Sequence, residues 1–172
     1  MPLLALDAAL ARCSAAIVAE DGTILAEASE AITQGQPARL PALAARVLAD
    51  AGLPGSGLSA VAAIVGPGSF TGLRTALALA QGIGLAAARP VIGVTTGEAL
   101  AAAAPAGVTV WATTDNRRGA LFLERVGQAP PEVVREEDLP APAGFTLILG
   151  DAAPRATARL AARGHRVALG DA

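Results

Sequence analysis

Apolar residues in the first part of the chain fall into short continuous runs, separated by longer segments of helical periodicity. Five runs have strand length: residues 3–7, 13–20, 23–29, 59–65 and 90–94. Three segments repeat apolar residues at helical spacing: residues 38–53, 71–88 and 97–104. Asp21-Gly22 is a hairpin turn signal between two of the strands, and the later strands alternate with helices. This order predicts a mixed α/β sheet in which the runs at 59–65 and 90–94 are buried.

The pattern starts again near residue 105. Residues 108–126 predict a hairpin with the charged sequence DNRRG at its tip, and an acidic, proline-bearing stretch follows. Residues 145–151 predict a further strand, and residues 154–165 predict an amphipathic helix. The restart predicts two domains: residues 1–105, and a smaller, shortened second lobe at residues 106–172.

The composition limits which side chains can fill the core and which kinds of functional site the chain can form. Apolar residues make up 53% of the 172 positions and aromatic residues 2%, so small side chains must fill the core. The formal net charge of −2 supplies no global basic field for nonspecific nucleic-acid binding. All 13 basic residues are arginine, which excludes lysine nucleophiles and a P-loop lysine. The lone Cys13, together with the lack of a signal-peptide pattern and of a membrane-length apolar run, predicts a cytoplasmic protein with no membrane contact.

The glycine-rich sequence GPGSFTG, residues 66–72, joins a predicted strand to a predicted helix. It lacks the lysine of a Walker A loop, the third glycine of a dinucleotide loop and both glycines of a nucleophile elbow. Ser69 has no base nearby in the sequence, since the one histidine, His165, lies far along the chain. One histidine and one cysteine do not predict a metal site. We therefore predict no catalytic residue and no metal ligand.

Two interpretations of this turn stay open. Gly66 and Gly68 permit positive φ angles at a sharp turn, and Ser69 or Thr71 can cap the helix. Alternatively, the exposed amides at the start of the helix bind an anion or the phosphate of a nucleotide. Asp7 ends the first strand and is either a turn-forming residue or a carboxylate that faces such a ligand. The candidate cofactor-binding residues are Asp7, Gly68 and Ser69.

The predicted helix at 71–88 carries an unbroken ridge of small residues at intervals of four: Gly72, Ala76, Ala80, Gly84 and Ala88. Two glycines inside a helix cost roughly 1 kcal/mol each relative to alanine, so close packing should offset them. The spacing leaves two partners open for this ridge. One is the chain's own sheet or the helix at 38–51, and the other is a helix of another protein.

Four stretches of the chain together resemble the bacterial TsaB (YeaZ) family. The most specific is GPGSFTGLRTALALAQGIGLA, residues 66–86, which closely resembles the family's signature. The family's opening strand pair, first helix and Asp-x-Arg-Arg-Gly hairpin are similar to LALDAALARCSAAIVAEDG (4–22), RLPALAARVLADAGL (39–53) and DNRRGALF (115–122). The resemblance implies an actin-like, ribonuclease H-like fold, with a mixed five-stranded sheet, helices and a second lobe that is shortened here.

The resemblance also implies a role in making N6-threonylcarbamoyladenosine in tRNA. In that family TsaD is the catalytic, metal-binding subunit, and TsaB is the non-catalytic scaffold that joins TsaD to the ATPase TsaE. The implied chain is a homodimer when alone, contacts tRNA only indirectly, and has no cofactor of its own, with ATP only in complex with partners. Asp7 is followed by Ala8 and Ala9 where relatives more often carry threonine and serine, which removes two potential phosphate donors.

Finally, the resemblance implies that the helices at 38–51 and 71–88 form the subunit interface. The predicted interface residues are Leu40, Leu43, Val47, Gly72, Arg74, Ala76, Ala80 and Gly84. On this view, Gly84→Leu or Ala80→Leu blocks pairing and leaves the fold largely intact. Two other functions remain alternatives: a small hydrolase or peptidase that uses Ser69, and a nucleotide-binding actin-like ATPase.

Overall fold

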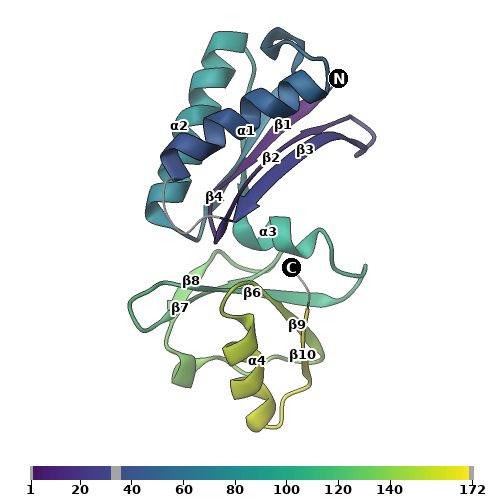
Figure 1. Ribbon diagram of the computed structural model, residues 1–172. Helices are drawn as coiled ribbons and strands as arrows, with labels where there is room; N and C mark the ends of the chain where they lie inside the picture. Colours follow the sequence, from purple (N-terminus) through teal and green to yellow (C-terminus); the bar gives the residue numbers. More distant parts are fainter. Residues whose placement is uncertain (1, 32–35, 171–172) are drawn as a thin grey trace. The chain divides into compact units, whose positions relative to one another are not determined.

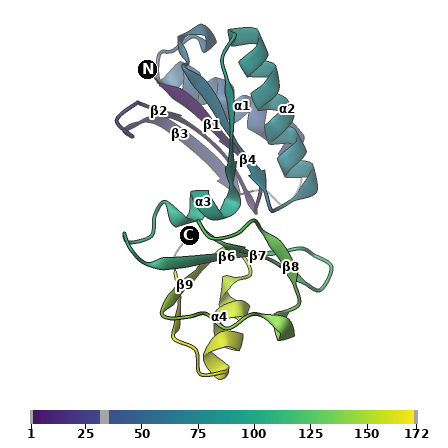
Figure 2. The same cartoon turned by 180° about the vertical axis from the view of Figure 1, so that it is seen from behind.

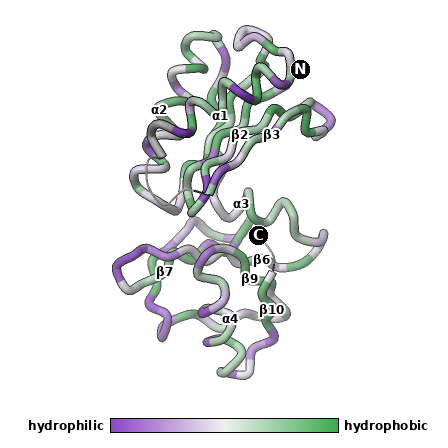
Figure 3. Tube along the Cα trace, viewed as in Figure 1, coloured by the Kyte–Doolittle hydropathy of each residue, from purple (hydrophilic) through white to green (hydrophobic). Residues whose placement is uncertain are grey.

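The computed structural model describes residues 2–31 and 36–170. The chain divides into two compact units, Met1–Val94 and Thr95–Ala172, and each unit is built on a five-stranded sheet (Figures 1 and 2). Hydrophobic residues concentrate in the strands and helices, and hydrophilic residues concentrate in the loops that connect them (Figure 3).

The first unit packs two helices against one face of its sheet. Its strands are β1 (Leu3–Asp7), β2 (Arg12–Val18), β3 (Ile24–Ala31), β4 (Ala60–Gly66) and β5 (Val91–Thr95). Their order across the sheet is β3-β2-β1-β4-β5, and β1 pairs antiparallel with β2 and parallel with β4. The helices α1 (Gln36–Asp50) and α2 (Phe70–Ala87) cover the same face, and a short 3-10 turn, Gly55–Gly57, precedes β4 (Figure 1).

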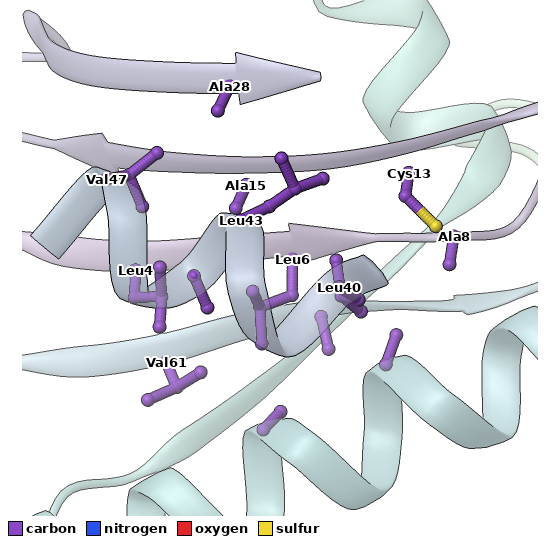
Figure 4. Close-up of a cluster of buried hydrophobic side chains, with 14 of the residues drawn as sticks. Leu4, Leu6, Ala8, Cys13, Ala15, Ala28, Leu40, Leu43, Val47 and Val61 are labelled. Carbon is purple, nitrogen blue, oxygen red and sulfur yellow. The ribbon is translucent and has the colours of Figure 1, made fainter. Parts of the chain in front are cut away.

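Small and medium side chains build the core of this unit, as the composition requires. Strands β1 and β2 and helix α1 contribute residues that are each at most 2% exposed: Leu4, Leu6, Cys13, Leu40 and Val47, which Figure 4 labels, together with Ile17. Burial raises the pKa of the Cys13 thiol, and the nearby carboxylates of Asp7 and Glu30 raise it further. The thiol therefore stays protonated and serves as a small apolar side chain.

Strand β5 differs from the prediction because it lies at the edge of the sheet. The continuous apolar run at 90–94 predicts a buried strand, but Val91 and Ile92 are 39% and 47% exposed. Strand β4, which has a similar apolar run, lies between β1 and β5 and is mostly buried. The prediction of burial is confirmed for β4 and is wrong for β5.

The second unit has its own sheet and its own core. Its strands are β6 (Thr109–Asp115), β7 (Leu121–Arg125), β8 (Glu132–Val134), β9 (Thr146–Leu149) and β10 (Val167–Leu169), in the order β10-β9-β6-β7-β8. Helix α4 (Ala153–Ala162) buries Ala156 and Leu160 in a core with Trp111 and Ile148, and a 3-10 turn, Glu136–Asp138, follows β8. The predicted hairpin at 108–126 is confirmed as β6 and β7.

Helix α3 (Thr96–Ala101) belongs to the second unit, so the chain divides before this helix and not between residues 105 and 106 as predicted. The backbone N–H of Gly97 donates to Glu124 Oε2 at 2.9 Å, and Thr95 Oγ1 donates to Glu124 Oε1 at 2.5 Å. Glu124 lies on β7 and is 4% exposed. These bonds attach α3 to the second sheet, which explains the earlier division.

The two sheets follow one plan. In each, two antiparallel hairpin pairings come first, and a later strand then pairs parallel with the first strand of its unit. Asp7 and Asp115 end the equivalent strands β1 and β6. Gly66 and Gly150 stand at the ends of the equivalent strands β4 and β9, with φ angles of +116° and +106°. This arrangement confirms the mixed sheets and the two related lobes that the family resemblance implies.

Candidate functional site

In the first unit, the turn GPGSFTG is connected by a hydrogen bond to the loop between β1 and β2. Ser69 is the N-cap of α2, and its Oγ accepts a hydrogen bond from the Gly72 N–H at 3.3 Å. The Ser69 N–H donates to Ala9 O at 2.7 Å, and Ala9 lies in the loop between β1 and β2. The peptide bond between Gly66 and Pro67 is cis. The capping interpretation is therefore confirmed for Ser69.

Two glycines of the turn face the backbone of that same loop. A Cβ added to Gly68 would overlap Ala9 O, and a Cβ added to Gly72 would overlap Ala8 O. Neither position can hold a larger residue unless the loop or the start of α2 moves, because both obstacles are backbone atoms. Close approach of two chain segments is thus sufficient to account for both glycines.

Asp7 closes the loop that follows β1. Its Oδ1 accepts the Ala9 N–H at 2.8 Å, which is the turn-forming role. Burial raises the pKa of Asp7, and the backbone hydrogen bonds from Ala9 and Ala8 offset part of that rise. Asp7, Gly68 and Ser69 all lie against the β1–β2 loop, but the chain itself uses several of their polar atoms. Binding of an anion or a nucleotide here stays a prediction.

The geometry gives no support to the hydrolase alternative. Within the described residues, no ionisable side chain forms a hydrogen bond with Ser69 Oγ, and no three His, Cys, Asp or Glu side chains converge as a metal site. Among the same residues, no helix combines the length and the apolar character needed to cross a bilayer.

Seven of the eight predicted interface residues face the interior of the first unit. These are Leu40, Leu43, Val47, Gly72, Ala76, Ala80 and Gly84. The small-residue ridge of α2 packs against the chain's own sheet, since a Cβ on Gly84 would lie 2.5 Å from Val91 Cγ2. The interface assignment is corrected for these seven residues, because the core already occupies their surroundings. A leucine at position 80 or 84 would disrupt the fold before it affected pairing.

The opposite face of α2 is exposed and largely apolar. We call it the outer α2 surface, and it consists of Phe70, Thr71, Arg74, Ala78, Gln81, Gly82, Leu85 and Ala86. Phe70 is 67% exposed and Leu85 is 86% exposed. The Arg74 guanidinium lies 3.8 Å from the centre of the Phe70 ring. Arg74 is thus the one predicted interface residue that lies on this surface.

The hairpin between β6 and β7 presents Arg117 and Arg118 at its tip. Asp115 Oδ1 accepts the Arg117 N–H at 2.7 Å, and Asn116 Oδ1 accepts the Arg118 N–H at 2.8 Å. Arg155 on α4 pairs with the other carboxylate oxygen of Asp115 at 3.0 Å. Side chains near the base therefore fix the backbone of the tip, and both tip arginines are exposed.

Sequence reasoning missed the buried carboxylate of Glu124. It accepts hydrogen bonds from Thr95 and Gly97, which lie 29 and 27 positions away in the chain. A Cβ on Gly97 would overlap the carboxylate, so the glycine is part of the same arrangement. Nothing in the spacing of these residues indicates that they meet, because only the packing of α3 on the sheet brings them together.

Two solved structures from Pseudomonas aeruginosa are similar to almost the whole chain. One is of a protein described by its similarity to the peptidase YeaZ, with a TM-score of 0.82 and 27% identity over 99% of this chain and 83% of that one. The other is of YeaZ, with a TM-score of 0.73 and 26% identity over 95% of each chain.

Comparisons of sequence agree with these structures. The model of the tRNA N6-adenosine threonylcarbamoyltransferase family, TsaD, matches residues 30–129. The Escherichia coli K12 tRNA threonylcarbamoyladenosine biosynthesis protein TsaB is 38% identical over 96 residues, or 56% of this chain and 41% of that protein. The chain thus spans about two fifths of the length of this curated relative. By motifs, fold and these similarities, the chain belongs to the TsaB/YeaZ family.

Proposed function

We propose that this chain is a non-catalytic scaffold subunit of the machinery that makes N6-threonylcarbamoyladenosine in tRNA. The E. coli relative is named for that biosynthesis, and the matching family model is that of the transferase. The proposed partners are a TsaD-like catalytic subunit and a TsaE-like ATPase. The chain alone pairs with a second copy of itself, needs no cofactor of its own, and encounters ATP only in the complex.

The outer α2 surface is the observation that carries this proposal. An exposed apolar helix face is costly on a monomer, because its apolar area stays in water. Phe70 and Leu85 lie near opposite ends of α2, and Ala78, Gly82 and Ala86 put small side chains between them or beside them. Large apolar side chains around a flat stretch of helix suit a second helix that packs across it.

Gly82 adds a more specific argument. A glycine inside a helix costs about 1 kcal/mol relative to alanine. Packing against the chain's own backbone and side chains accounts for Gly72 and Gly84, but a Cβ on Gly82 would meet no atom within 4 Å. Close approach of a partner's helix would account for this glycine as well.

Size exclusion with light scattering tests the proposal, on the chain alone and mixed with its TsaD-like partner. Gly82→Leu adds bulk to the outer α2 surface and improves helix propensity, so the fold should persist while pairing weakens at least tenfold. Ala158→Leu, at an exposed position of α4, is the matched control and should pair as the wild type does.

A wild-type chain that stays monomeric and ignores the TsaD-like subunit would refute the scaffold function. Equal pairing by wild type and Gly82→Leu would show that a different surface is used. Loss of threonylcarbamoyladenosine in cells that carry only Gly82→Leu, with normal protein levels, would connect the pairing to the modification.

A further inference from the structure

At one hairpin tip, the side chains of two adjacent arginines have no partner among the residues that the structure describes. The side chains of nine of the 13 arginines form an ion pair, a hydrogen bond or a ring contact. Within the described residues, the four that form none are Arg117, Arg118, Arg159 and Arg166. Only the first two are consecutive, and they form the exposed, strongly hydrophilic tip between β6 and β7 (Figure 3).

The carboxylates near this tip are already engaged. Asp115 holds the Arg117 N–H with one oxygen and pairs with Arg155 through the other. Asp151 Oδ1 accepts the Asp115 N–H at 2.9 Å. These acidic groups therefore stiffen the base of the hairpin, and the guanidinium groups of Arg117 and Arg118 remain available to a ligand.

The backbone of Arg117 is in a conformation that arginine seldom adopts. Its φ angle is +56°, in the left-handed region that glycine and asparagine occupy at lower cost. In the first unit the equivalent position after Asp7 is Ala9, whose loop lies against the start of α2. Because backbone strain of this kind clusters at functional sites, the exposed Arg117 side chain is a candidate for ligand contact.

We infer that Arg117 and Arg118 bind phosphates of an RNA backbone. The inference rests on the proposed function, in which tRNA is the substrate of the complex. A guanidinium donates two parallel hydrogen bonds to phosphate oxygens. The Cα atoms of the two residues are about 3.8 Å apart, so their long side chains can reach neighbouring phosphates of one strand.

This form of contact fits the rest of the chain. The net charge of −2 gives no general attraction for RNA, so attraction must be local. Phosphate contacts position a nucleic acid without reading its sequence, so exposed arginine side chains at a hairpin tip are sufficient to make them. The inference replaces the expectation that the chain meets tRNA only through its partners.

Fluorescence anisotropy with a labelled, unmodified tRNA transcript tests the inference across a salt series, with the full chain alone and in complex with its TsaD-like partner. Arg117→Gly/Arg118→Ala should lower affinity at least tenfold at about 0.1 M salt. It should also reduce the slope of log affinity against log salt by about 1.4–1.8, the value for two lost phosphate contacts. Glycine accepts the φ angle of residue 117, so the melting temperature should stay the same or rise.

Arg159→Ala/Arg166→Ala removes the same charge from the same unit and is the matched control, with little expected change. Equal effects of the two double variants, an unchanged salt slope in the tip variant, or no binding of tRNA by the wild type would each overturn the inference. A tip variant that binds tRNA normally but pairs poorly with the TsaD-like subunit would show that the tip contacts protein instead. Failure of the wild type to pair at all would refute the proposed function and leave the RNA measurement to decide the inference separately.

Discussion

Replacement of glycine by alanine should have opposite effects on stability at two positions of α2. The reason is that Gly72 contacts the β1–β2 loop, whereas Gly82 does not. Gly82→Ala adds a methyl group that meets no atom of the chain within 4 Å, so in the monomer, at concentrations too low for pairing, helix propensity alone changes. That change stabilises a helix interior by about 1 kcal/mol. Gly72→Ala adds the same methyl group onto the carbonyl oxygen of Ala8.

Relief of that overlap requires the loop or the first turn of α2 to move. Overpacking of this kind costs about 1–3 kcal/mol, and weakening of the Ser69 cap adds about 1 kcal/mol. The gain in helix propensity is small at Gly72, because this residue lies in the first turn. We expect Gly72→Ala to lose about 2 kcal/mol, so that the two variants differ by about 3 kcal/mol.

Urea unfolding followed by far-ultraviolet circular dichroism measures this difference, since the one tryptophan, Trp111, lies in the second unit. With a slope of about 2 kcal/mol per M, Gly82→Ala should raise the midpoint by about 0.5 M and Gly72→Ala should lower it by about 1 M. An unchanged or higher midpoint for Gly72→Ala would refute the close contact between Gly72 and the β1–β2 loop. A lower midpoint for monomeric Gly82→Ala would mean that another part of the chain contacts residue 82.

Three further substitutions test the roles of the Asp7 and Glu124 carboxylates. The raised pKa of Asp7 means that the folded chain holds this proton more tightly than the unfolded chain, so stability falls as pH rises from 3.8 through the folded value. Asp7→Asn keeps the acceptor for the Ala9 N–H and should raise the urea midpoint at neutral pH, with a gain that shrinks toward low pH. In the second unit, Glu124→Ala leaves the Gly97 N–H and the Thr95 hydroxyl unpaired and should cost about 1–3 kcal/mol by Trp111 fluorescence. Gly97→Ala should cost a similar amount alone but little in the Glu124→Ala background, and additive losses would contradict the direct contact.

Helical spacing was sufficient to locate α2 and its small-residue face, but not to say what that face contacts. The period of a helix defines which residues share a side. The direction of that side depends on residues distant in the sequence, here Ala8 and Val91, which approach Gly72 and Gly84. Four of the five predicted interface residues of α2, all except Arg74, therefore face the core. Exposed Phe70 precedes the first residue of the ridge and exposed Leu85 lies between its last two, and the pair has no periodic signal of comparable strength.

Strand order and the boundary between the two units also depend on contacts between residues distant in the sequence, so they were harder to predict. An apolar run fits a central strand or an edge strand, and only the order β3-β2-β1-β4-β5 puts Val91 and Ile92 at an edge. Nothing in the sequence of α3 indicates which unit it joins, but Glu124 attaches it to the later sheet. By contrast, the cap at Ser69 was predictable, because the hydroxyl and the amide that it accepts from are only three residues apart.

Because the two sheets share one plan, the same aspartate turn occurs after the first strand of each unit. Its surroundings differ between the two units. In both units an aspartate at the end of the first strand accepts the N–H two residues later: Asp7 from Ala9, and Asp115 from Arg117. In the first unit, alanines let this turn pack under α2, and the glycines of GPGSFTG make room for it. In the second unit the turn continues into a hairpin tip, whose charged side chains, Arg117 and Arg118, are exposed. The glycines of the signature motif are therefore explained by close packing on the first turn, and the exposed arginines of the equivalent turn remain available for contact with a ligand.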